Sequence, residues 1–130
     1  MLGTNDIRHI FTPSVKEIAA GMVNLVKMAR NPDTYWVGER PEVLVIVPAP
    51  VRDEIASSDF YGMYDEESVS KSKALYAAYE AALKGMEGVW LLDAGKVAEV
   101  SVKDCIHLSR EGHRNLGRAA AECIEEILKI

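Results

Sequence analysis

The sequence predicts an α/β protein in which helices alternate with the strands of a parallel sheet. The first observation is a pair of short apolar runs, residues 43–47 and 89–92, which contain no charged side chain. Such runs are typical of strands that helices cover on both faces. The second observation is three longer segments with apolar residues at the three- and four-residue spacing of a helix. Their order along the chain is that of α/β folds, although two strands are few for one sheet.

The first helix is expected to begin at Thr12 and Pro13, because threonine is a favoured N-cap and proline fits the first helical position. Its apolar face would contain Val15, Ile18, Ala19, Met22, Leu25, Val26 and Ala29. The turn signal at residues 31–33 ends it. Tyr35, Trp36 and Val37 are then expected in a partly packed connection rather than in a strand.

A long polar connection follows the first strand, from Pro48 to about Asp65. Loops of this length without regular structure are uncommon in compact domains and are often functional. This one contains four large side chains, those of Phe60, Tyr61, Met63 and Tyr64. We expect them to form a wall of a substrate pocket or a contact between subunits.

The two remaining helices flank the second strand. One is expected over residues 66–84, before Gly85 and Gly88, with its inward face formed by Val69, Leu75, Ala78, Tyr79, Ala82 and Leu83. The last helix is expected after Ser109, a favourable N-cap. It would bury Leu116, Ala119, Ala120, Cys123, Ile124, Ile127 and Leu128.

The composition fits one globular domain over residues 1–130, with 48% hydrophobic and 27% charged residues. Fifteen basic against twenty acidic residues give a net charge of −5, which argues against a nucleic-acid or anionic-membrane partner. No apolar stretch is long enough for a membrane span. Two cysteines, Cys105 and Cys123, suit a reducing compartment, so a cytoplasmic location is expected.

Two short constellations could carry chemistry. Asp104 and His107 stand three residues apart just before the last helix, where a carboxylate could orient an imidazole as a general base. The pair could equally cap and fix that helix. Near the start, Gly3 allows close backbone approach, and the side-chain amide of Asn5 can donate to a developing oxyanion. Taken alone, the segment 3–6 could equally be an ordinary turn.

Together and in this order, the two constellations resemble conserved motifs of the GDSL/SGNH hydrolase family of esterases and lipases. Gly3-Thr4-Asn5-Asp6 matches its third block, Gly-x-Asn-Asp, and residues 104–107 match its fifth block, Asp-x-x-His. The strand ending at Val47 and the turn at residues 93–95 also fit, most closely in the branch of bacterial arylesterases and acyltransferases. The resemblance implies the carboxyl-terminal part of a flavodoxin-like α/β/α fold.

The resemblance also implies the role of each residue. His107 would be the general base, Asp104 its orienting acid, and Asn5 an oxyanion donor. Gly3, Thr4 and Asp6 would form the loop that positions Asn5. The implied reaction is acyl transfer from a small-molecule ester through a serine-bound intermediate, with no metal or organic cofactor.

The family's nucleophilic serine and oxyanion glycine belong to blocks that would precede Met1. No serine of the chain stands in a Gly-Asp-Ser context, so no nucleophile is assigned within it. An active enzyme would therefore need the missing amino-terminal part. The alternative is an inactive module that associates with itself or with a partner along its exposed strand edge. A third possibility is a thiol-dependent or metal-assisted hydrolase that uses Cys105 or Asp104 with His107, although metal sites need more convergent ligands.

Overall fold

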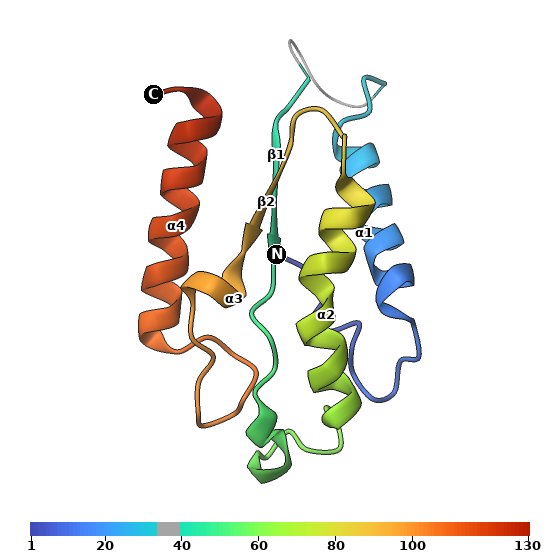
Figure 1. Ribbon diagram of the computed structural model, residues 1–130, viewed down its shortest axis with the longest axis vertical. Helices are drawn as coiled ribbons and strands as arrows, with labels where there is room; N and C mark the ends of the chain where they lie inside the picture. Colours follow the sequence, from blue (N-terminus) through green and yellow to red (C-terminus); the bar gives the residue numbers. More distant parts are fainter. Residues whose placement is uncertain (34–39) are drawn as a thin grey trace.

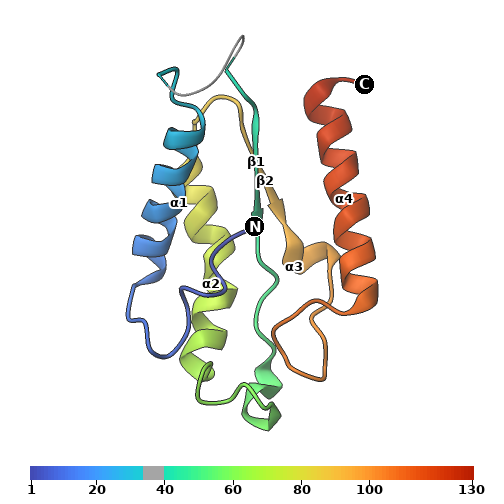
Figure 2. The same ribbon diagram turned by 180° about the vertical axis from the view of Figure 1, so that it is seen from behind.

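A two-stranded parallel sheet lies between helices in the computed structural model, which describes residues 1–33 and 40–130 (Figure 1). Strand β1 (Val43–Val47) pairs with β2 (Val89–Asp93), with Val43 opposite Val89. Helices α1 (Val15–Ala29) and α2 (Glu66–Leu83) lie on one side of the sheet, and α4 (Arg110–Leu128) lies on the other (Figures 1 and 2). The predicted three-layer α/β/α arrangement with a parallel sheet is confirmed.

The first helix begins two residues later than predicted. Its N-cap is Ser14, whose hydroxyl accepts a hydrogen bond from the backbone N–H of Glu17, while the Glu17 carboxylate accepts from the Ser14 backbone N–H at 2.7 Å. This reciprocal capping box satisfies two helix-end donors at once, an advantage that Thr12 does not have. The predicted inward face is correct except at Leu25, which is exposed.

The main core lies between α1, α2 and the sheet. Its largest fully buried side chains include Tyr79 and Leu75 of α2 and Val47 of β1. The start of the chain belongs to the same core, since Ile7 is buried there. The same segment passes close to the carboxyl-terminal end of β1, since a Cβ at Gly3 would lie 3.7 Å from the Pro48 ring. Tyr35, Trp36 and Val37, expected in a connection, lie outside the described residues.

Two short helices were not expected from the sequence. The connection after β1 contains a 3₁₀ helix, η1 (Asp53–Ser57), whose Ile55 is fully buried. A single helical turn, α3 (Ala94–Val97), follows β2 directly and is capped by the Asp93 side chain. The connection is therefore more ordered than its polar composition suggested.

The prediction that α4 buries a row of apolar side chains is correct only in part, because five of the seven are half-buried and two are exposed. Ser109 caps the helix as expected, but Gly112 is its one buried residue. Leu116 packs partly against a small apolar cluster of Ala49, Ala94 and Val100, whereas Ile124 and Leu128 are exposed. The strand over residues 89–92 was also expected to be covered on both faces, but Trp90 of β2 is exposed. Both corrections have one cause: within the described parts of the chain, little packs between α4 and the sheet.

No helix in those parts has the length and apolarity that crossing a bilayer requires.

Candidate active site

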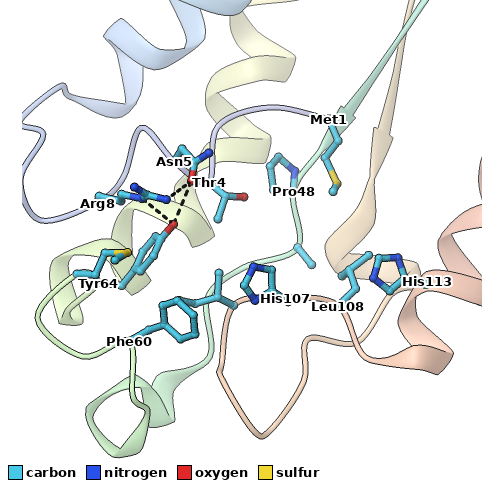
Figure 3. Close-up of a pocket in the computed structure, with 13 residues that line it drawn as sticks. Met1, Thr4, Asn5, Arg8, Pro48, Phe60, Tyr64, His107, Leu108 and His113 are labelled. Carbon is cyan, nitrogen blue, oxygen red and sulfur yellow. Dashed lines mark hydrogen bonds between the residues drawn. The ribbon is translucent and has the colours of Figure 1, made fainter.

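A pocket of about 280 Å³ opens at the carboxyl-terminal ends of the strands (Figure 3). Four segments that are distant in the sequence form its walls. Its lining residues are Met1, Thr4, Asn5, Arg8, Pro48, Ala49, Phe60, Met63, Tyr64, Ile106, His107, Leu108 and His113. In open α/β sheets this edge is where ligands usually bind. The pocket brings together Asn5 and His107, the two central residues of the sequence motifs.

Asp104 and His107 form a hydrogen-bonded pair. His107 Nδ1 lies 3.0 Å from Asp104 Oδ2, and the backbone N–H groups of Ile106 and His107 both donate to Asp104 Oδ1. An ionised carboxylate only accepts hydrogen bonds, so the ring proton lies on Nδ1 and the lone pair on Nε2. With its side chain 66% exposed, His107 can offer that lone pair as a base. Asp104 thus orients the ring and fixes the turn before α4, but it does not cap that helix, whose N-cap is Ser109.

The charge of Asp104 is stabilised in this turn. Partial burial alone would raise the pKa of its carboxyl, but the hydrogen bonds from Ile106, the His107 backbone and the His107 ring together lower the pKa below its ordinary value. The backbone of residues 104–107 turns sharply, because Cys105 adopts a left-handed φ of 65°. Backbone hydrogen bonds from Arg52 to Cys105 and from Ser101 to His107 hold it in place. Cys105 is 2% exposed, as a structural thiol would be.

Gly3 positions the loop that carries Asn5. Its φ is +130°, and a Cβ at this position would lie 2.8 Å from the hydroxyl of Tyr79. That hydroxyl donates to the backbone carbonyl of Leu2 at 3.0 Å. Burial, together with the charge of Asp6, raises the pKa of Tyr79 to about 12, so the donor proton is retained. Glycine is therefore required where the chain passes over the buried tyrosine.

The remaining predicted loop residues differ in position. Thr4 lines the pocket beside Asn5, whereas Asp6 lies outside it, where a hydrogen bond from its backbone N–H to Gly3 closes a turn. Residues 3–6 therefore form a turn, as the alternative interpretation held, and two of them, Thr4 and Asn5, also line the pocket. His9 does not line the pocket, and its ring pairs with Asp65 at 2.6 Å.

An apolar wall faces His107. The ring of Phe60 meets the imidazole edge-on, with 5.7 Å between the centroids. Met63 and Tyr64 also line the pocket, as expected for this connection, but Tyr61 is exposed outside it. His113, in the first turn of α4, lines the opposite side (Figure 3).

None of the serines in the described residues lines this pocket. Ser58 contacts the motif, but its hydroxyl donates to the backbone carbonyl of Asp104 at 2.8 Å and accepts from the backbone N–H of Phe60. It therefore supports the Asp104–His107 turn. Over the same described residues, no three His, Cys, Asp or Glu side chains converge as a metal site would require.

The sequence did not single out Arg8, and it placed Tyr64 in a pocket wall without predicting its contact with Asn5. Both side chains hydrogen-bond the carbonyl oxygen of Asn5 at the pocket wall (Figure 3). Arg8 stands three residues after Asn5 and could have been noticed as a local partner. Tyr64 is 59 residues from Asn5 and has no local signal.

Comparison with known proteins identifies structural relatives. No protein-family model matches the chain, and a search of curated proteins finds no match either. Among solved structures, a carbohydrate acetylesterase family member from Sinorhizobium meliloti has a TM-score of 0.88 at 28% identity, and a second carbohydrate acetylesterase from that organism has 0.82 at 34%. An aryl esterase of M. smegmatis has 0.84 at 30%. These matches cover 98–100% of this chain but only 59–60% of the length of those proteins.

Proposed function

The chain belongs to the GDSL/SGNH hydrolase family, and on that premise we propose that it works as part of a serine ester hydrolase acting on short acyl esters. The observation that carries the proposal is the pocket in which Asn5 and the Asp104-oriented His107 face one space. In this role the chain supplies the base, its orienting acid and one oxyanion donor. The nucleophilic serine comes from a polypeptide segment outside residues 1–130.

The reaction follows from the atoms that face the pocket. His107 Nε2 takes the proton from the serine hydroxyl as its oxygen attacks the ester carbonyl. The side-chain N–H of Asn5 donates to the resulting oxyanion. Collapse of this intermediate breaks the bond to the alkoxy group, which leaves as an alcohol with the proton from His107. His107 then activates water in the same way, and the acid and the free serine are released.

The form of the pocket supports a small acyl group. Phe60, Ile106 and Leu108 give the pocket, of about 280 Å³, apolar walls close to His107. Ligand pockets for drug-sized molecules commonly have about 300–1,000 Å³. The description of two relatives as carbohydrate acetylesterases agrees with a short acyl chain.

The open edge of β1 supports the proposed origin of the serine. In the described part of the chain β1 pairs only with β2, so its other edge has unpaired backbone groups. Met1 and Leu2, which directly precede the loop that carries Asn5, are also exposed. An added parallel strand would pair with this edge and would end at the same edge of the sheet as β1 and β2, where the pocket opens. The solved relatives are long enough to contain such a segment.

The test is to isolate the native protein, map its peptides, and identify any segment that is joined to or associated with this chain. Hydrolysis of a short-chain aryl ester is then measured for that assembly and for its His107→Ala variant. We expect a serine-bearing segment, and hydrolysis that the variant loses. An assembly without such a segment, or hydrolysis that does not depend on His107, would overturn the proposal.

A second candidate function has its own supporting observation. The bare edge of β1 and the exposed apolar side chains of α4, such as Ile124 and Leu128, suit a module that binds a second copy or another protein. In that case the isolated chain forms a dimer or a larger oligomer. Light scattering at micromolar concentration tests this, and a monomer would contradict self-association.

A further inference from the structure

Three side chains at the wall of the pocket form a closed triangle of hydrogen bonds (Figure 3). Arg8 Nη2 donates to Asn5 Oδ1 at 2.9 Å, and Arg8 Nε donates to Tyr64 Oη at 3.3 Å. Tyr64 Oη in turn lies 3.4 Å from Asn5 Oδ1. Both partners therefore contact the same oxygen of the asparagine side chain.

The polarity of this triangle follows from chemistry alone. A guanidinium group has only donors, so the Asn5 atom that faces Arg8 must be the carbonyl oxygen and not the amide nitrogen. Because Tyr64 Oη accepts from Arg8, its own proton is free to donate to the same carbonyl oxygen. The amide flip of Asn5, which is often ambiguous, is thus fixed by its partners. Its Nδ2 is the end directed away from Arg8 and Tyr64 (Figure 3).

The two partners are themselves held in place. Tyr64 is 2% exposed, and its backbone N–H donates to the carbonyl of Phe60. The guanidinium carbon of Arg8 lies 5.9 Å from the centre of the Tyr64 ring, a cation–π distance. The backbone N–H of Arg8 donates to the carbonyl of Asn5 itself. An exposed asparagine is thereby attached to a buried aromatic anchor.

We propose that Arg8 and Tyr64 are positioning residues that orient Asn5 as an oxyanion donor. They hold its carbonyl oxygen at the wall, which leaves the Nδ2 protons for a charge in the pocket. The cation on the oxygen side also polarises the amide and strengthens Nδ2 as a donor. This inference rests on the proposed function, because it concerns the residue that would meet the oxyanion.

The first test uses the assembled protein and needs no activity. The side-chain amide signals of Asn5 are recorded by ¹⁵N NMR in the wild type and in the Arg8→Met, Tyr64→Phe and Arg114→Met variants. Arg114 is the matched control, because it pairs with Glu111 on α4, far from the pocket loop in sequence. We expect shifted Asn5 amide signals and faster proton exchange in the first two variants only. Signals unchanged by both Arg8→Met and Tyr64→Phe would overturn the proposal.

The second test uses the assembled esterase. Arg8→Met is expected to lower kcat about tenfold and to change KM less than about twofold, because a mispositioned oxyanion donor affects mainly the transition state. Arg8→Lys, which keeps a donor and a charge, should recover part of the loss. Combining Arg8→Met with Asn5→Ala should lower kcat no further than Asn5→Ala alone.

The outcomes separate this inference from the proposed function. If His107→Ala abolishes hydrolysis but Asn5→Ala leaves kcat unchanged, the esterase function stands and the oxyanion role of Asn5 fails, together with the positioning roles of Arg8 and Tyr64. If Asn5→Ala lowers kcat but Arg8→Met and Tyr64→Phe do not, the proposed function stands and the positioning roles are contradicted.

Discussion

The Asp104 carboxylate binds His107 twice, through the imidazole Nδ1 at 3.0 Å and through the backbone N–H at 2.9 Å. The residue that orients the ring therefore also shapes the turn from which the ring projects. Such double contact couples the structure of the turn to the chemistry of the base. It also makes Asp104 the residue whose replacement tests both.

Replacing Asp104 by Asn should reduce ester hydrolysis by about 10²–10⁴-fold, because an amide nitrogen facing Nδ1 favours the tautomer with the proton on Nε2. His107 would then have no lone pair for the serine proton. The measurement is kcat for a short-chain aryl ester, with the assembled protein. A rate within a fewfold of the wild type would mean that Asp104 acts only as a turn residue.

The same carboxylate predicts how stability depends on pH. Its folded-state pKa lies below the ordinary value of 3.8, so its contribution is complete above that value. The contribution is lost as the pH falls through the lowered folded pKa. Urea unfolding of the wild type and Asp104→Asn should therefore differ at neutral pH, and the difference should shrink in strong acid. A difference that does not change with pH would show that the charge of Asp104 is not responsible.

Gly3→Ala should lower the free energy of unfolding by about 1–3 kcal/mol, because alanine is strained at a positive φ and its Cβ would meet the Tyr79 hydroxyl at 2.8 Å. Gly21→Ala is the matched control, since Gly21 lies within α1 and a Cβ there meets nothing within 4 Å. That change should be stabilising by roughly 0.5–1 kcal/mol. Chemical denaturation measures both. Equal effects would contradict the close approach at Gly3.

Asn5→Ala should reduce kcat by about 10²–10³-fold, because one oxyanion donor is lost. Asn5→Asp is the sharper variant, since it keeps the shape of the side chain but replaces the donor with a carboxylate that repels the oxyanion. We expect the kcat of Asn5→Asp to be at least as low as that of Asn5→Ala. An active aspartate variant would argue against oxyanion stabilisation by this side chain.

Local patterns in the sequence predicted the main elements well. The run of β-branched residues at 43–47 and the capping residue Ser109 gave correct starting points because each acts over a few residues. The N-cap of α1 was misplaced since Thr12 and Ser14 are both good caps, and only the reciprocal bond with Glu17 selects Ser14. The burial of α4 could not be read from its periodicity. An apolar helical face shows that something can cover it, but not what does.

The sequence also singled out residues that lie at the pocket. Asn5, Asp104 and His107 lie in short motifs whose residue types directly suggest their chemistry, and the pocket joins Asn5 to His107. Tyr64 carries no such signal, because its partnership with Asn5 depends on how a distant connection folds back onto the first loop. Residues that position other residues are hard to find from sequence for this reason.

The most direct test of the account is to locate the nucleophile with a serine-directed fluorophosphonate. The native assembly is labelled, digested and mapped by mass spectrometry, beside the 130-residue chain alone and a His107→Ala assembly. The account predicts one adduct on a serine outside residues 1–130, none on the chain alone, and slow labelling without His107. An adduct on any serine of this chain, or labelling that is equally fast without His107, would contradict it.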